Sequence, residues 1–94
     1  MPRRAAKKDN NHKDIARTLT DVGCEVFDLS SLPGACDVLV GYRGKLTILE
    51  IKQPASRNDL TDLEQKMIAR LRRVGAPVFV VCDADEALKA VGAI

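Results

Sequence analysis

The feature that most constrains the fold of this chain is a pair of apolar runs separated by only two residues. Residues 37–42 (DVLVGY) and 45–52 (KLTILEIK) are rich in β-branched and large apolar side chains, and Arg43-Gly44 alone links them. Such a two-residue link predicts an antiparallel β-hairpin. Because the two strands run in opposite directions, the start of the first must lie beside the end of the second.

Upstream of the hairpin, the pattern predicts a helix and then a strand. Asn10 or Asn11 is expected to cap a helix that runs to about Val22, and Ile15, Leu19 and Val22 form one apolar stripe along it. Residues 24–29 alternate as a half-buried strand does, and Pro33-Gly34 marks a turn before the hairpin.

Downstream of the hairpin, a helix, a strand and a second helix are expected. Thr61 with Glu64 three residues later forms a capping box that opens the first of these helices. Its buried face is predicted to consist of Leu63, Met67, Ile68, Leu71 and Val74. Residues 77–83 are almost continuously apolar, as in a strand covered on both faces. Asp83 with Glu86 forms another capping box, which opens a short last helix that Gly92 closes. The order α-β-β-β-α-β-α predicts an α/β domain with a mixed central sheet.

The positive charge of the chain is concentrated near its start. The 15 Lys and Arg against 13 Asp and Glu give a net charge of +2, and residues 1–13 hold five basic residues against one acidic, or +4, which leaves −2 for the rest. We therefore predict a basic, flexible arm over residues 1–8 and a single domain over 9–94. The cations expected to contact DNA phosphates are Arg3, Arg4, Lys7 and Lys8. A solvated, disordered N-terminal segment that binds no partner explains the same charges equally well.

Cysteine usage and hydropathy favour a cytoplasmic location. The three cysteines are an odd number without C-x-x-C spacing, which argues against a disulfide framework and a zinc knuckle. They are expected to be buried, reduced thiols. No apolar stretch approaches the roughly 20 residues of a membrane span. We expect a protein of the cytoplasm of a bacterial or phage-infected cell.

The charged end of the hairpin carries the candidate chemistry. Side chains alternate along a strand, so Glu50 and Lys52 share a face, and Asp37 lies almost opposite Glu50 across the hairpin. Two carboxylates with a backbone carbonyl, such as that of Ile51, suit Mg²⁺ or Mn²⁺, and a lysine beside them can orient a metal-bound water. A cross-strand ion pair at the end of a sheet explains the same three residues.

From residue 9 onward the chain resembles the PD-(D/E)xK nuclease superfamily. Within it, the chain is similar to small phage and prophage proteins related to the VRR-NUC family and to Holliday-junction resolvases. The matching segments occur in the family's order, and they are residues 34–44 (GACDVLVGYRG), 49–52 (LEIK), Leu60-Thr61 with Glu64-Gln65, and 85–88 (DEAL) before Val91-Gly92.

The resemblance implies a restriction-endonuclease-like core and a metal-dependent endonuclease acting on DNA, including branched DNA such as a Holliday junction. It implies that Asp37 and Glu50 bind Mg²⁺ or Mn²⁺ and that Lys52 serves the attacking water. It also implies supporting roles for Asp14, where the family usually has a glutamate, and for Gln65. The resolvases that this chain resembles work as dimers, so the resemblance also implies a homodimer. Near the hairpin and the loop that follows it, Lys45 and Arg57 are expected to contact DNA.

Two other functions remain open at this point. One is a non-catalytic module that binds nucleic acid or supports an assembly and has kept the nuclease fold. The other is a small subunit that binds proteins. Retention of Asp37, Glu50 and Lys52 together favours the nuclease.

Overall fold

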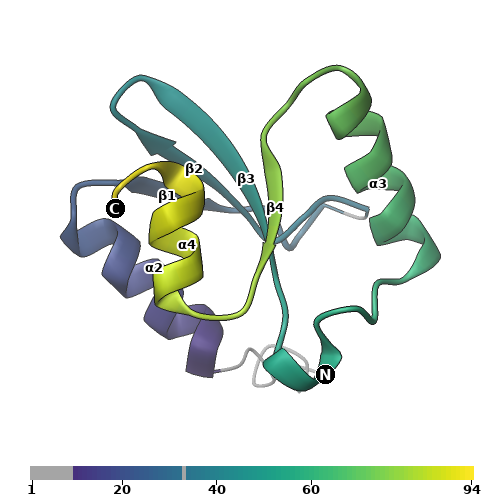
Figure 1. Ribbon diagram of the computed structural model, residues 1–94, viewed down its shortest axis with the longest axis horizontal. Helices are drawn as coiled ribbons and strands as arrows, with labels where there is room; N and C mark the ends of the chain where they lie inside the picture. The colour runs from purple at the N-terminus through teal and green to yellow at the C-terminus, as the bar shows by residue number, and fades with distance from the viewer. Residues whose placement is uncertain (1–9, 33) are drawn as a thin grey trace.

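The computed structural model describes residues 10–32 and 34–94, so the predicted basic arm and Pro33 lie outside the described residues. One four-stranded sheet is flanked by α2 and α4 on one side and by α3 on the other (Figure 1). In chain order the elements are α2 (Asn10–Asp21), β1 (Glu25–Asp28), β2 (Val38–Tyr42), β3 (Lys45–Ile51), the 3-10 helix η1 (Pro54–Ser56), α3 (Asp62–Arg73), β4 (Val78–Val81) and α4 (Ala84–Val91). The predicted α/β class and element order are confirmed.

The sheet has the order β1-β2-β3-β4 and is mixed, as predicted. β1, β2 and β3 pair antiparallel, whereas β4 runs parallel to β3. The hairpin turns at Arg43 (φ 48°) and Gly44 (φ 82°), both in the left-handed region that a two-residue type I′ turn requires. This turn fixes the register of β2 against β3, and that register places the charged ends of the two strands together.

The larger core lies between the sheet and the helices α2 and α4. Ile15 and Leu19 of α2 are fully buried there against residues of the sheet and α4: Cys24, Val38, Val40, Leu49, Val81, Ala87 and Val91. The predicted helical stripe is wrong at its last member, because α2 ends at Asp21 and leaves Val22 42% exposed.

The smaller core lies under α3 and consists of Cys36, Ile68 and Val78 with half-buried neighbours. The predicted buried face of α3 is wrong at its two ends, since Leu63 is 56% and Val74 75% exposed. The helix packs mainly on β4, and its ends extend beyond that short strand. The expectation that β4 is covered on both faces is confirmed, because Val78 packs under α3 and Val81 packs in the core with α2 and α4, although Phe79 remains 39% exposed.

The capping box predicted for α3 is confirmed, whereas the one predicted for α4 is only half formed. The Thr61 hydroxyl accepts a hydrogen bond from the Glu64 N–H, and the Glu64 carboxylate accepts one from the Thr61 N–H, which completes the capping box of α3. Asp83 caps α4 through the Glu86 N–H, but the Glu86 carboxylate accepts from the Cys82 N–H instead of from the cap residue. The caps fix where α3 and α4 begin, beside the end of β3 and the end of β4.

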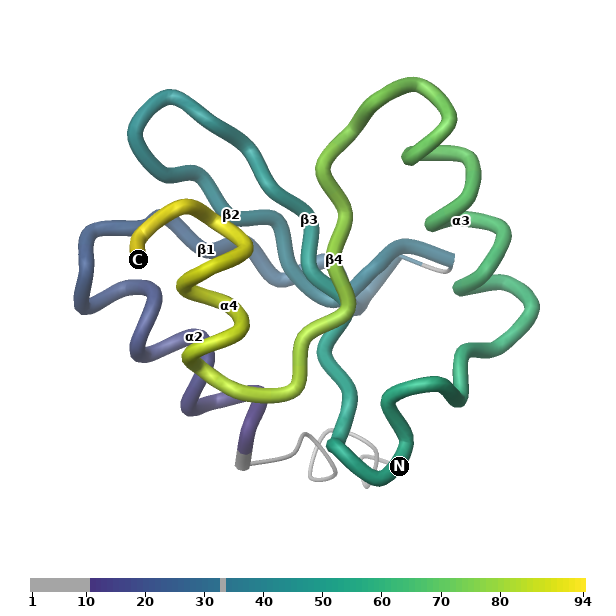
Figure 2. The backbone as a smooth tube through the Cα atoms, in the orientation of Figure 1, coloured from purple at the N-terminus to yellow at the C-terminus, as the bar shows by residue number. Residues whose placement is uncertain are grey.

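Between β3 and α3 the chain leaves the sheet and passes through η1. It then continues into α3, on the side of the sheet opposite α2 and α4 (Figure 2). Arg57, just after η1, holds this segment to α4 by an ion pair of 2.6 Å with Glu86. Among the described residues, no helix has the length and apolar character needed to cross a membrane.

Candidate active site

The hairpin brings Asp37 next to Glu50. The last register pair of β2 and β3 is Val38 with Leu49, so Asp37 and Glu50 occupy the next position along both chains. The Asp37 N–H donates to the Leu49 carbonyl at 3.1 Å, and the Ile51 N–H donates to the Asp37 carboxylate at 2.7 Å. The Asp37 side chain is therefore held against β3 by the backbone of the residue between Glu50 and Lys52.

Glu50 is a buried acid on the α3 side of the sheet, only 3% exposed. Burial, followed by the charge of Asp37 and a hydrogen bond with Glu64, raises the pKa of Glu50 from 4.5 to about 8, and Lys52 only partly offsets this. Burying a carboxyl next to a second carboxyl disfavours the ionised form. In the absence of a cation, Glu50 keeps its proton at neutral pH.

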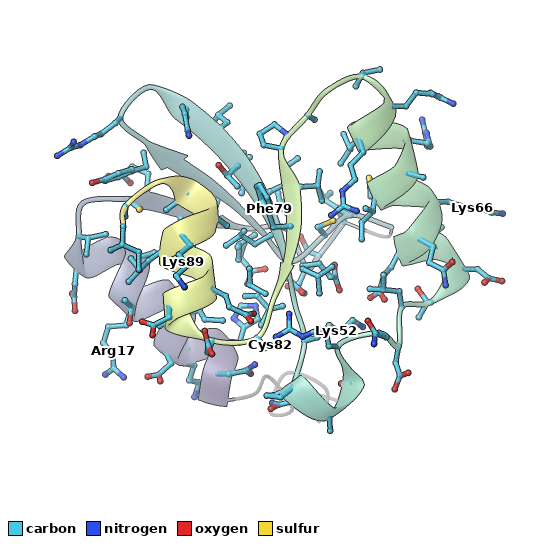
Figure 3. All side chains as sticks on the ribbon, viewed as in Figure 1. Arg17, Lys52, Lys66, Phe79, Cys82 and Lys89 are labelled. Carbon is cyan, nitrogen blue, oxygen red and sulfur yellow. The ribbon has the colours of Figure 1, made fainter. Side chains whose placement is uncertain are left out.

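Lys52 lies between two carboxylates at the lower end of the sheet (Figure 3). Its Nζ is 3.0 Å from Glu64 Oε1 and 3.9 Å from Glu50 Oε2. Burial lowers the pKa of Lys52, but the hydrogen bond and charge of Glu64 and the charge of Glu50 outweigh burial, so the pKa is raised overall. The side chain is an ammonium group held at a fixed place in the site.

Glu64 is the member of this cluster that sequence reasoning did not assign to it. Burial raises the pKa of Glu64, but the hydrogen bonds from the Thr61 N–H, Lys52 and Glu50 outweigh burial and lower the pKa overall. The sequence signal for Glu64 is its place in the capping box, which predicts a role at the start of α3 but not a contact with Lys52. The same carboxylate both caps α3 and reaches Lys52.

Cys36 lies directly before Asp37 and is buried beside the acids. Burial, together with the charges of Glu50 and Asp37, raises the pKa of the Cys36 thiol to about 12. A thiol this hard to ionise is a poor nucleophile and a poor metal ligand at neutral pH. All three cysteines are buried and free, as predicted.

Asn11 also contributes to the site and was not predicted to do so. It lies inside the first turn of α2 rather than capping the helix, and its Nδ2 donates to the carbonyls of Lys52 (3.0 Å) and Cys82 (3.1 Å). Gln53 Nε2 donates to Asn11 Oδ1 at 3.1 Å. These bonds tie together the backbones that leave β3 at Lys52 and β4 at Cys82.

Two supporting residues implied by the resemblance do not reach Asp37 and Glu50. Asp14 is exposed on α2, across the sheet from α3, and pairs with Arg17 at 3.1 Å. Gln65 is exposed on α3, and its Nε2 donates to the Leu60 carbonyl at 3.0 Å. Successive side chains on a helix point about 100° apart, so with Glu64 turned to the site Gln65 faces solvent.

The residues expected to contact DNA are scattered. Lys45 is at the turn end of β3, about 17 Å along the strand from Glu50 at the usual rise per residue. Arg57 is engaged with Glu86. The cations of the arm, Arg3, Arg4, Lys7 and Lys8, lie outside the described residues. His12 is half-buried, and its shielded Nε2 has no hydrogen-bond partner within the part of the chain that the structure describes.

Within residues 10–32 and 34–94, no group of three or more His, Cys, Asp and Glu side chains is arranged to hold a metal ion. Mg²⁺ keeps several water ligands and commonly needs only one or two carboxylates from the protein. Asp37 and Glu50 are two such hard oxygen donors, and a cation bound beside them would favour the ionised form of Glu50, whose pKa is raised by burial and by the charge of Asp37. The donor set thus fits a hydrated Mg²⁺ or Mn²⁺ and not a zinc site built from protein ligands.

No family model, curated protein or solved structure matches this chain.

Proposed function

We propose that this protein is a metal-dependent endonuclease of the PD-(D/E)xK type that hydrolyses phosphodiester bonds in DNA. The observation that carries the proposal is the meeting of Asp37, Glu50 and Lys52 at one end of the hairpin, with Glu50 buried and its pKa raised to about 8. A strongly perturbed acid beside a specific charge partner marks a candidate catalytic site. The order of elements and the mixed sheet are consistent with a restriction-endonuclease-like core.

In this proposal Asp37 and Glu50 hold Mg²⁺ or Mn²⁺. When bound, the metal lowers the pKa of a water ligand and offsets charge on the phosphate. Asp37 is kept in place by the Ile51 N–H, so its carboxylate does not have to be ordered when the cation arrives. Lys52 supplies a fixed positive charge beside the two acids, where it orients the attacking water and stabilises the added negative charge.

The burial of Glu50 supports catalysis over a purely structural ion pair. Burying an acid whose pKa is raised costs stability, and a cross-strand ion pair that served the fold alone would lower that pKa. A non-catalytic nucleic-acid-binding module also has no need for a carboxyl in this position. We further propose a cytoplasmic role in a bacterial or phage-infected cell, in keeping with the three free thiols.

A gel assay of the purified protein tests the proposal directly. Supercoiled plasmid, linear duplex and a four-way junction are incubated with Mg²⁺, with Mn²⁺ or with EDTA, and a Lys52→Ala preparation made in parallel controls for contaminating nucleases. We expect metal-dependent cuts that the variant does not make. Cleavage that is equal in both preparations, or none by the wild type on any substrate, would refute the proposed activity.

A further inference from the structure

The carboxylate of Glu64 joins the start of α3 to the charged end of β3. Its Oε1 accepts from the Thr61 N–H at 2.9 Å and from Lys52 Nζ at 3.0 Å. The side chain also shares a hydrogen bond with Glu50. Among the described residues, Glu64 makes the shortest ion pair of Lys52, since the contact with Glu50 is 3.9 Å.

We propose that Glu64 is a positioning residue that fixes the Lys52 ammonium beside Asp37 and Glu50 for the reaction; this inference rests on the proposed endonuclease function. Lysine has a flexible four-carbon stem, so its charge needs a partner to stay in one place. Glu64 provides one because it is itself held by the Thr61 backbone, and the pair is shielded, with 17% and 24% of the two side chains exposed. A short, charge-assisted hydrogen bond of this kind sets geometry as well as energy.

The capping box offers variants that separate this role from a structural one. Glutamine serves as well as glutamate at the third helical position, so Glu64→Gln keeps an acceptor for the Thr61 N–H but removes the charge opposite Lys52. Thr61→Ala has the converse effect: the hydroxyl that accepts from the Glu64 N–H is lost, whereas the backbone N–H that holds the Glu64 carboxylate remains.

The first measurement is single-turnover cleavage of DNA at saturating Mn²⁺, together with thermal unfolding. For Glu64→Gln we expect a melting temperature lowered no more than in Thr61→Ala, because the cap acceptor remains and only the ion pair is lost. We also expect an unchanged DNA concentration at half-maximal rate and a maximal rate lowered about 10- to 100-fold, the scale of a displaced catalytic group. For Thr61→Ala we expect a melting temperature lower by about 4–8 °C, from the loss of a cap, and a rate close to that of the wild type.

The second measurement needs no activity. In protein labelled with ¹⁵N-lysine, the Lys52 ammonium signal, assigned by its loss in Lys52→Ala, should be visible in the wild type and in Thr61→Ala because its exchange with water is slow. It should broaden or vanish in Glu64→Gln.

The possible failures are distinct. An active wild type with an equally active Glu64→Gln variant, or an ammonium signal unaffected by that substitution, would overturn the inference and leave the proposed function standing. A wild type that never cuts DNA would overturn the function itself, and the positioning role in catalysis with it.

Discussion

Replacing Glu50 with glutamine should stabilise the protein, increasingly so at higher pH, even though it removes half of the proposed metal centre. Burial, the charge of Asp37 and the contacts of Glu64 raise the pKa of Glu50 from 4.5 to about 8. The folded state therefore binds this proton more tightly than the unfolded state does. Below pH 4.5 both states are protonated. As the pH rises from 4.5 to about 8, the unfolded state ionises first and the stability contributed by Glu50 falls, and above that window it stays low.

The size of the effect follows from the two pKa values. Values of 4.5 and about 8 differ about 3,000-fold in proton affinity, which corresponds to about 5 kcal/mol of unfolding free energy, and about 4 kcal/mol of it is lost between pH 5 and pH 9. The glutamine in Glu50→Gln has nearly the same shape, and its amide donates to Glu64 as the protonated acid does, but it does not titrate. Relative to the wild type, the variant should gain about 4 kcal/mol over that range.

Urea denaturation in EDTA at pH 5, 7 and 9 measures this difference with no metal involved. Glu25→Gln, which removes an exposed acid from β1, is the matched control and should follow the wild type at every pH. All other titratable groups are common to both proteins, so their pH dependence cancels when the two unfolding free energies are subtracted. Parallel curves for wild type and Glu50→Gln, or a variant that is less stable throughout, would refute the argument that Glu50 is a buried acid held for a cation.

Three further predictions concern the reaction, the arm and the assembly. Lys52→Ala should slow cleavage at least about a hundredfold while DNA and Mn²⁺ binding persist in filter-binding and calorimetric assays, and a variant that cuts at the wild-type rate would exclude the assigned role. Deleting residues 1–8 removes four cations and should lower the log–log salt slope of DNA affinity by up to about 3.6, whereas an unchanged slope would show that the arm does not contact phosphates. Light scattering at micromolar concentration should give about twice the chain mass of 10.2 kDa, through the edge of β1 or through α3, and a mass near 10 kDa throughout would rule out the homodimer.

The sequence was sufficient to predict the hairpin and the pairing of its charged ends. A two-residue turn with a glycine leaves a single register, and the register alone determines that Asp37 lies opposite Glu50. The capping residue Thr61 and the αL glycine that ends α4, Gly92, were predictable for a similar reason. These signals are local, and the backbone geometry they demand admits few alternatives.

Features that depend on how one element rotates against another could not be predicted in this way. Whether Glu64 or Gln65 reaches Lys52 depends on the rotation of α3 about its axis, and an error of one residue exchanges a buried position for an exposed one. Arg57 was expected to meet DNA, but it pairs with Glu86, which is distant in sequence. The bonds of Asn11 likewise join α2 to strand ends that no local pattern connects.

The proposed active site requires above all that Asp37 and Glu50 together hold a divalent cation. Calorimetric titration of Mn²⁺ into the wild type, Asp37→Asn and Glu50→Gln at pH 8.5 tests it, because Glu50, with a pKa of about 8, is mostly ionised there and few protons have to be displaced. We expect binding by the wild type and by the Glu25→Gln control, and an affinity at least about tenfold weaker in each of the other two variants, since each loses one of two charged ligands. Equal Mn²⁺ affinity in all four proteins would contradict the account and leave Asp37, Glu50 and Lys52 as a cross-strand network of ion pairs.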